Sequence, residues 1–110
     1  MGWLRKLFGS DKPEANMASI TDDNFTQEVM QSSIPVLLDI WSPGCAPCNR
    51  LAPIVMELSR KYDGRLKVAE LNAANAPRTA AHLSVRGTPT VIYFKNGKEA
   101  ERIVGFRGQL

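Results

Sequence analysis

Cysteine and histidine are scarce in this sequence: its 110 residues include two cysteines and one histidine. Both cysteines fall in one Cys-x-x-Cys, whereas a secreted disulfide scaffold spreads about four or more cysteines along its chain. A zinc or iron–sulfur site normally takes about four ligands, so a metal site here would need cysteines from two chains. His82 is far from the pair in sequence, and we interpret it as an exposed helix residue. We therefore expect no metal and a reducing, cytoplasmic compartment.

Long apolar runs and blocks of like charge are also absent. No stretch approaches the ~20 apolar residues of a membrane span, and residues 1–10 lack the apolar centre of a secretory signal. The net charge of +3 comes from 14 basic and 11 acidic side chains that are interleaved, so nucleic-acid binding gains no support. The length suits one domain, and the 44% hydrophobic content suits an ordinary globular core.

The first 16 residues differ from the rest and are interpreted as an amphipathic arm and linker, followed by one domain over residues 17–110. Apolar side chains recur in the arm at helical spacing: Trp3, Leu4, Leu7 and Phe8. They predict either contact with a membrane surface or a partner through residues 3–8, or a short arm that fills a gap on its own domain or is disordered. Because so short a helix is marginal in water, the membrane reading is the less favoured.

Apolar periodicity and turn residues predict an α/β domain with the element order αβαβαββ. Strands joined through a helix are expected to be parallel, and Asn96-Gly97 predicts a final hairpin that adds an antiparallel edge. Pro53 is expected to kink the second helix. The predicted helices cover residues 22–31, 46–62 and 76–83, and the predicted strands cover 35–41, 66–71, 89–94 and 99–104.

The Cys45-Ala46-Pro47-Cys48 segment stands where a buried strand ends and a helix begins. A helix N-terminus carries unpaired N–H groups and partial positive charge, which lower the pKa of a cysteine from about 8.5 toward ~7. Cys45 is therefore the predicted attacking thiolate, and Cys48, one turn on, resolves the mixed disulfide. Pro47 fits an early helical position because the N–H it lacks has no partner there.

Asp39 is the one charge within an apolar strand. Burial raises the pKa of an aspartate and suits it to exchanging protons near neutral pH. We interpret Asp39 as general acid/base for Cys48, acting through a water molecule. The alternative is an edge aspartate that points to solvent.

Four motifs in the same order and spacing closely resemble the thioredoxin family: residues 36–41 (VLLDIW), 45–48 (CAPC), 86–90 (RGTPT) and 95–98 (KNGK). The resemblance covers residues 20–105. It implies a thioredoxin-like fold, in which a mixed central sheet is flanked by helices. It also implies a cis peptide bond before Pro89. By the same resemblance Pro89 packs beside the cysteines, helps bind an extended substrate and keeps metals away. It also implies no cofactor beyond the redox-active disulfide, and thioredoxin reductase as electron donor. The expected substrate-binding residues are Trp41, Gly44, Ala46, Pro47, Thr88, Pro89 and Gly105.

Three substitutions depart from the family pattern. Gly44 stands where thioredoxins usually have tryptophan, which makes the apolar rim around the nucleophile smaller. Ala46 replaces a glycine and should stiffen the turn. Glu70 stands where a lysine is common, so it either shares a site with Asp39 and raises one pKa of the pair, or turns to solvent.

The sequence ends at Leu110, where thioredoxins begin their last helix, so we expect that helix to be absent. An apolar patch would then be exposed on the terminal strands. Dimerisation, a swapped element, or cover by the Trp3–Phe8 arm would each bury it. A shortened sequence is also possible.

The predicted activity is thiol–disulfide exchange, in which the chain acts as a protein-disulfide reductase on disulfide-containing proteins. Because the dipeptide between the cysteines has no histidine, a residue that oxidising members of the superfamily often carry there, the expected potential is nearer ~−270 mV than ~−120 mV. The alternative is a binding module or subunit on the same scaffold, in which the cysteines are secondary.

Overall fold

The computed structural model describes residues 16–106 and 108. The arm and linker were predicted over residues 1–16, and all of this segment except Asn16 lies outside the described residues. The predictions of membrane contact through this arm and of its role as a cover fall outside them too. Asn16 lies at the start of the described chain, where its side-chain amide donates a long hydrogen bond of 3.5 Å to Asp63.

A mixed five-stranded sheet forms the centre of the described residues, with strand order β1-β3-β2-β4-β5. β1, β3 and β2 are parallel to one another, while β4 and β5 are each antiparallel to the preceding strand in this order. The predicted mixed α/β sheet is confirmed. Its strands are β1 (Met17–Ile20), β2 (Val36–Trp41), β3 (Lys67–Asn72), β4 (Thr90–Lys95) and β5 (Lys98–Val104).

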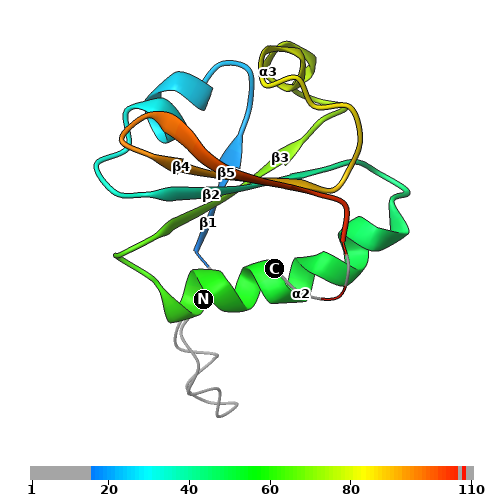
Figure 1. Ribbon diagram of the computed structural model, residues 1–110, viewed down its shortest axis with the longest axis horizontal. Helices are drawn as coiled ribbons and strands as arrows, with labels where there is room; N and C mark the ends of the chain where they lie inside the picture. Colours follow the sequence, from blue (N-terminus) through cyan, green and yellow to red (C-terminus); the bar gives the residue numbers. More distant parts are fainter. Residues whose placement is uncertain (1–15, 107, 109–110) are drawn as a thin grey trace, which may run out of the picture.

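Helices cover both faces of this sheet (Figure 1). α2 (Ala46–Lys61) runs along one face and continues through Pro53. α3 (Pro77–His82) and the helical turn η1 (Thr26–Met30) lie on the opposite face. Three layers result, with α2 leading directly from the end of β2.

The sheet divides the apolar core into two clusters. The larger one packs beneath η1 and α3 and includes Leu38 and Ile40 of β2. The smaller one packs against α2 and includes Leu51 and Val55. Because side chains alternate along a strand, Asp39 faces the α2 side, between two residues that face the other way.

The direction of β4 differs from the sequence prediction. β3 and β4 are joined through α3, yet β4 is antiparallel to β2 and therefore to β3. α3 has six residues and spans roughly 9 Å, whereas a six-residue strand spans about 20 Å. The helix is too short to carry the chain back along the sheet, so β4 starts at the end where β3 finished.

The hairpin at Asn96-Gly97 is confirmed. Both residues have positive φ, 54° at Asn96 and 74° at Gly97, as a two-residue type I′ turn requires. It brings the chain back as β5, whose pairing with β4 has an irregularity between Tyr93 and Phe94.

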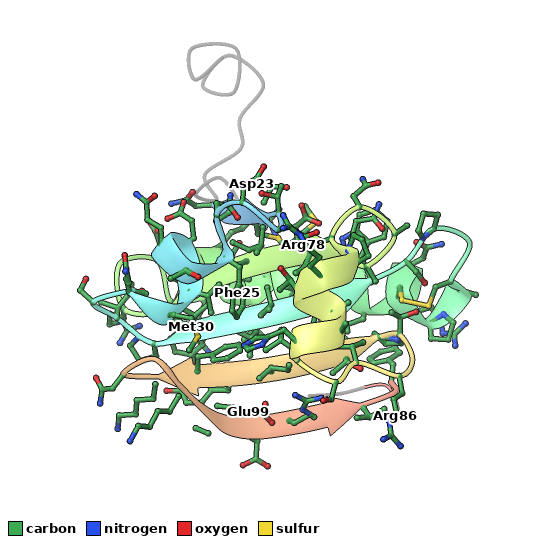
Figure 2. All side chains as sticks on the ribbon, turned by 90° about the horizontal axis from the view of Figure 1, so that it is seen from above. Asp23, Phe25, Met30, Arg78, Arg86 and Glu99 are labelled. Carbon is green, nitrogen blue, oxygen red and sulfur yellow. A yellow bond between two sulfur atoms is a disulfide. The ribbon has the colours of Figure 1, made fainter. Side chains whose placement is uncertain are left out.

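The predicted helix over residues 22–31 is wrong in extent. The structure has a π-helical turn over Thr26–Met30, with Phe25 also helical just before it, and the N–H of Gln31 closes the turn by donating to the carbonyl of Thr26. β1, which precedes this turn, was missed. Asp22, which precedes this turn, accepts hydrogen bonds from the backbone N–H groups of Arg78 and Thr79 in α3. Figure 2 looks onto this face, with Phe25 and Met30 of the turn region on one side and Arg78 on the other.

Candidate redox site

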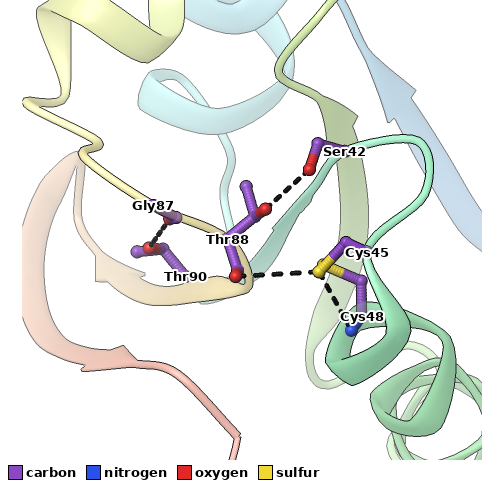
Figure 3. Close-up of a disulfide and its surroundings, with 6 residues drawn as sticks. All are labelled: Ser42, Cys45, Cys48, Gly87, Thr88 and Thr90. Atoms are coloured by element: carbon purple, nitrogen blue, oxygen red, sulfur yellow. Dashed lines mark hydrogen bonds between the residues drawn. A yellow bond between two sulfur atoms is a disulfide. The ribbon is translucent and has the colours of Figure 1, made fainter.

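Cys45 and Cys48 form a disulfide at the start of α2, with their Cα atoms 5.2 Å apart (Figure 3). Cys45 is the N-cap residue of the helix, and its sulfur accepts the backbone N–H of Cys48 over 3.3 Å. A helix needs side-chain acceptors here because its first N–H groups have no intrahelical partner. The sequence thus places a sulfur atom where the helix offers a hydrogen bond and partial positive charge.

The two sulfurs differ in their access to solvent. Cys45 is half-buried at the surface, whereas Cys48 is 5% exposed and faces the sheet. Pro47 lies in the first turn of α2, in a position where no N–H is needed. A substrate disulfide can therefore reach Cys45 more readily than Cys48.

A second loop, residues 87–90, lies against the disulfide (Figure 3). The Thr88–Pro89 peptide bond in it is cis, as the resemblance implied. The carbonyl oxygen of Thr88 lies 3.7 Å from the Cys45 sulfur. In the reduced protein the Cys45 thiol can donate a hydrogen bond to this oxygen, whereas a disulfide sulfur has no hydrogen to donate. Gly105 joins this loop because its N–H donates to the Pro89 carbonyl over 2.9 Å.

Hydroxyl groups hold that loop in place. Ser42, just after β2, and Thr88 have their side-chain oxygens 2.6 Å apart, and Thr90 donates to the carbonyl of Gly87 over 2.7 Å. Figure 3 shows both contacts beside the cysteines. The loop that faces the reactive sulfur is thus fixed from two sides.

Asp39 is buried on the α2 side of β2, so the reading as a solvent-facing edge aspartate is wrong. The side chain is 5% exposed, and its Oδ1 has no hydrogen-bond partner among residues 16–106 and 108. Burial, and secondly the charge of Glu70, raise its pKa from 3.8 to about 6. This carboxyl group can therefore take up or release a proton close to neutral pH.

A cavity of about 270 Å³ connects Asp39 with the redox pair. Its lining is mostly apolar, and Cys48 and Asp39 both contribute to it. Glu70 is the register partner of Asp39 on β3, and Trp41 lies at the end of β2. The remaining lining comes from β1 and α2; the full set is Met17, Asp39, Trp41, Cys48, Asn49, Ala52, Met56 and Glu70.

Comparison with known proteins then decides the family, because the family model described as Thioredoxin matches residues 16–110. The chain belongs to the thioredoxin family. It is 41% identical over 88 residues to "Thioredoxin 1" of Nostoc sp., covering 80% of this chain and 82% of the relative. It is also 41% identical over 86 residues to "Thioredoxin" of Synechocystis sp. (78% and 80%), and over 91 residues to "Thioredoxin M-type, chloroplastic" of Chlamydomonas reinhardtii (83% and 65%).

Thioredoxin family members are protein disulfide oxidoreductases, and the Cys-x-x-Cys on which that chemistry depends is present here as a disulfide. The predicted family and fold are confirmed. The chain is a thiol–disulfide oxidoreductase, and members of its family act on disulfide-containing substrates.

The residues expected to bind substrate do not all lie on one surface patch. Thr88 lies beside Cys45, and Gly44 and Ala46 are exposed on either side of that cysteine. Pro89 is fully buried behind Thr88, and Gly105 joins it through a backbone hydrogen bond. Trp41 instead lines the cavity beneath, where its indole N–H donates to the carboxylate of Glu70. His82 is exposed on α3, as expected.

Ser42, Met17 and Met56 were missed as site residues. Ser42 carries no sequence signal beyond its place between a buried strand and the cysteines. Met56 could have been found, because it lies eight residues after Cys48 and so within the same broad stripe of α2. Met17 could not, since β1 reaches the site only through its pairing with β3.

Proposed function

We propose that this thioredoxin-family chain works as a reductant of protein disulfides, with Cys45 as attacking thiolate, Cys48 as resolving thiol and Asp39 as general acid/base. The observation that carries the proposal is the asymmetry of the pair. Cys45 lies at the helix start within reach of a partner, while Cys48 is buried over the cavity that contains Asp39.

In the first step, the Cys45 thiolate attacks one sulfur of the substrate disulfide. A sulfur–sulfur bond forms between Cys45 and the substrate, the substrate disulfide breaks, and its second sulfur leaves as a thiolate that takes a proton. The N–H of Cys48, which lies 3.3 Å from the Cys45 sulfur, stabilises the attacking thiolate. We therefore expect the pKa of the Cys45 thiol in the reduced protein to lie below that of a free cysteine.

In the second step, Cys48 gives its proton to the carboxylate of Asp39 and attacks the Cys45 sulfur. The Cys45–substrate bond breaks, the substrate leaves reduced by two electrons, and the Cys45–Cys48 disulfide remains. A water molecule in the shared cavity can carry the proton between Cys48 and Asp39. The two sulfurs hold both electrons, so this cycle uses no bound cofactor.

The chain must be reduced again by an electron donor. Family members are reduced by thioredoxin reductase or by ferredoxin–thioredoxin reductase, and the similarity to cyanobacterial and chloroplast thioredoxins supports testing both. We propose thioredoxin reductase as the first choice, in a reducing compartment such as the cytoplasm. Among the residues that the structure describes, no helix is long and apolar enough to cross a membrane.

Insulin reduction coupled to each reductase tests the activity and the donor together. We expect the wild type to be active with one of them, Cys45→Ser to be inactive, and Cys48→Ser to accumulate a mixed disulfide with insulin through Cys45. If Cys45→Ser instead accumulated a mixed disulfide with insulin through Cys48, as fast as Cys48→Ser does through Cys45, the assigned roles of the two cysteines would be reversed.

The direction of the reaction is tested by equilibrating the wild type with glutathione. A potential near ~−270 mV supports a reductant, whereas a value well above that of protein disulfide isomerase, ~−180 mV, contradicts it. The role of Asp39 is tested with Asp39→Asn: release of the mixed disulfide should slow, while formation of the mixed disulfide should not. Asp63→Asn, an exposed aspartate near β1, is the matched control.

A further inference from the structure

Two carboxylates, Asp39 and Glu70, lie side by side in the cavity behind the redox pair. They are register partners on the adjacent parallel strands β2 and β3, and both line the same cavity. Neighbouring strands are about 4.8 Å apart, so two charges on the same face of such a pair lie within strong electrostatic range. Asp39 is buried, and its Oδ1 has no hydrogen-bond partner in the described part of the chain, whereas Glu70 is half-buried.

No cation offsets these two charges within the described part of the chain that lines the cavity. From α2 the cavity receives Cys48, Asn49, Ala52 and Met56, from β1 it receives Met17, and from β2 itself it receives Trp41. On its other side β2 pairs with β4, where the register partner of Asp39 is Val91. Among the described residues that line this cavity, the ionisable groups beside Asp39 are therefore Glu70 and, in the reduced protein, the Cys48 thiol.

Glu70 does not turn freely into solvent, because the indole N–H of Trp41 donates a hydrogen bond to its carboxylate. Trp41 and Glu70 belong to neighbouring strands, and both line the cavity. The tryptophan thereby holds the Glu70 carboxylate at the cavity, next to the buried aspartate.

We propose that Glu70 is a positioning residue for the exchange reaction: held by Trp41, its carboxylate makes Asp39 a stronger base toward the Cys48 thiol. This inference rests on the acid/base role proposed above for Asp39. The charge of Glu70 disfavours the ionised form of Asp39, so the aspartate binds more tightly the proton that Cys48 must lose before it attacks Cys45. Burial supplies the larger part of the effect on Asp39, and Glu70 supplies the rest.

The coupling is tested by following the carboxyl carbon of Asp39 by NMR against pH in the oxidised full chain. In Glu70→Gln we expect the Asp39 midpoint to fall by roughly half to one pH unit, because the neighbouring charge is lost while the shape is kept. Glu57→Gln, an exposed acid on α2 that pairs with Arg60, is the matched control and should leave the midpoint unchanged. An unchanged midpoint in Glu70→Gln overturns the proposal.

Trp41→Phe removes the N–H donor and keeps an aromatic ring, so it tests how Glu70 is held. We expect the Asp39 midpoint to fall in the same direction as in Glu70→Gln but by less. In the double variant Trp41→Phe/Glu70→Gln the midpoint should match that of Glu70→Gln alone, because Trp41 acts through Glu70. Two independent, additive shifts would contradict that link.

The kinetic consequence is measured as release of a mixed disulfide formed with a small aromatic disulfide, followed between pH 5 and 9. In Glu70→Gln the pH midpoint of release should move down together with the NMR midpoint, and release should slow by a few fold. One outcome would refute the acid/base role of Asp39 and leave the charge coupling intact. In it, Glu70→Gln shifts the Asp39 midpoint but not the release profile, and Asp39→Asn also releases the mixed disulfide normally. An altered release profile in Asp39→Asn with no effect of Glu70→Gln would refute the role of Glu70 alone.

Discussion

The carboxylate of Asp22, in the turn after β1, accepts two hydrogen bonds from Thr79 in the first turn of α3. Its Oδ1 lies 2.7 Å from the backbone nitrogen and 2.8 Å from the hydroxyl oxygen of Thr79. The residue that precedes α3, Ala76, has no side-chain acceptor, so Asp22 supplies from another segment what a local cap would supply. Figure 2 shows the same meeting point, with Asp23 and Arg78 side by side.

We expect Asp22→Ala to lower the urea midpoint of unfolding, with a larger effect at pH 7 than at pH 3. Burial raises the pKa of Asp22, but hydrogen bonds from Thr79 and Arg78 outweigh it and hold the pKa below its usual value. A carboxyl whose folded pKa is depressed stabilises the protein above its unfolded pKa, and that stability is lost as pH falls through the folded pKa. Asp23→Ala, at an exposed neighbour, is the control. Equal losses in the two variants would contradict the cap.

Asp39→Asn should stabilise the oxidised protein at pH 8 by on the order of 3 kcal/mol and have little effect at pH 3. The pKa of Asp39 is raised from 3.8 to about 6, first by burial and then by Glu70. Between these values the folded state holds a proton that the unfolded state has released, so stability falls as pH rises through this window. Urea unfolding of both proteins at pH 3, 5 and 8 checks this. A difference that is the same at every pH would mean that Asp39 has the same pKa in the folded and unfolded states, which contradicts a raised pKa in the folded protein.

Gly97→Ala should destabilise the protein by about 2–4 kcal/mol. Gly97 has a φ of 74°, and a Cβ there would lie 2.8 Å from the carbonyl oxygen of Met30. Gly64→Ala separates the two causes, since Gly64 has a φ of 83° but open space around its missing Cβ, and should cost about 1 kcal/mol. Chemical denaturation measures both. Similar losses in the two variants would show that the contact with Met30 carries no cost.

Gly44→Trp, which introduces the residue most common in the family, should destabilise this chain by about 1–2 kcal/mol. Gly44 has a φ of 74°, a backbone conformation that a tryptophan adopts only with strain. Gly44→Asn should cost less, because asparagine tolerates this conformation. Thermal unfolding of both oxidised variants measures the difference, and a Trp variant as stable as the wild type would show that the loop rearranges freely.

The parts of the fold with dense apolar patterns could be predicted from the sequence. β2 and α2 emerged clearly because one is a continuous apolar run and the other repeats apolar residues at helical spacing. β1 was missed because its four residues include small side chains and an exposed Ser19. Its strand structure comes from pairing with β3, a relationship far apart in sequence.

The chemistry of the site could be predicted further than its surroundings. The place of Cys45 and Cys48 at a helix start and the burial of Asp39 followed from local pattern. Whether Glu70 faces Asp39 depends on the register between β2 and β3, which no local pattern contains, so the sequence left two equal readings. The structure selects the shared cavity over solvent.

The sheet separates the chemistry from most of the apolar core. Cys48 and Asp39 lie on the α2 side, next to the smaller cluster, while the larger cluster is on the other side of the same strands. Opening the disulfide or charging the aspartate therefore changes the layer between the sheet and α2, and the larger cluster on the other side of the sheet stays packed. An oxidoreductase built this way can pass between its dithiol and disulfide forms while the larger part of its apolar interior keeps the same packing.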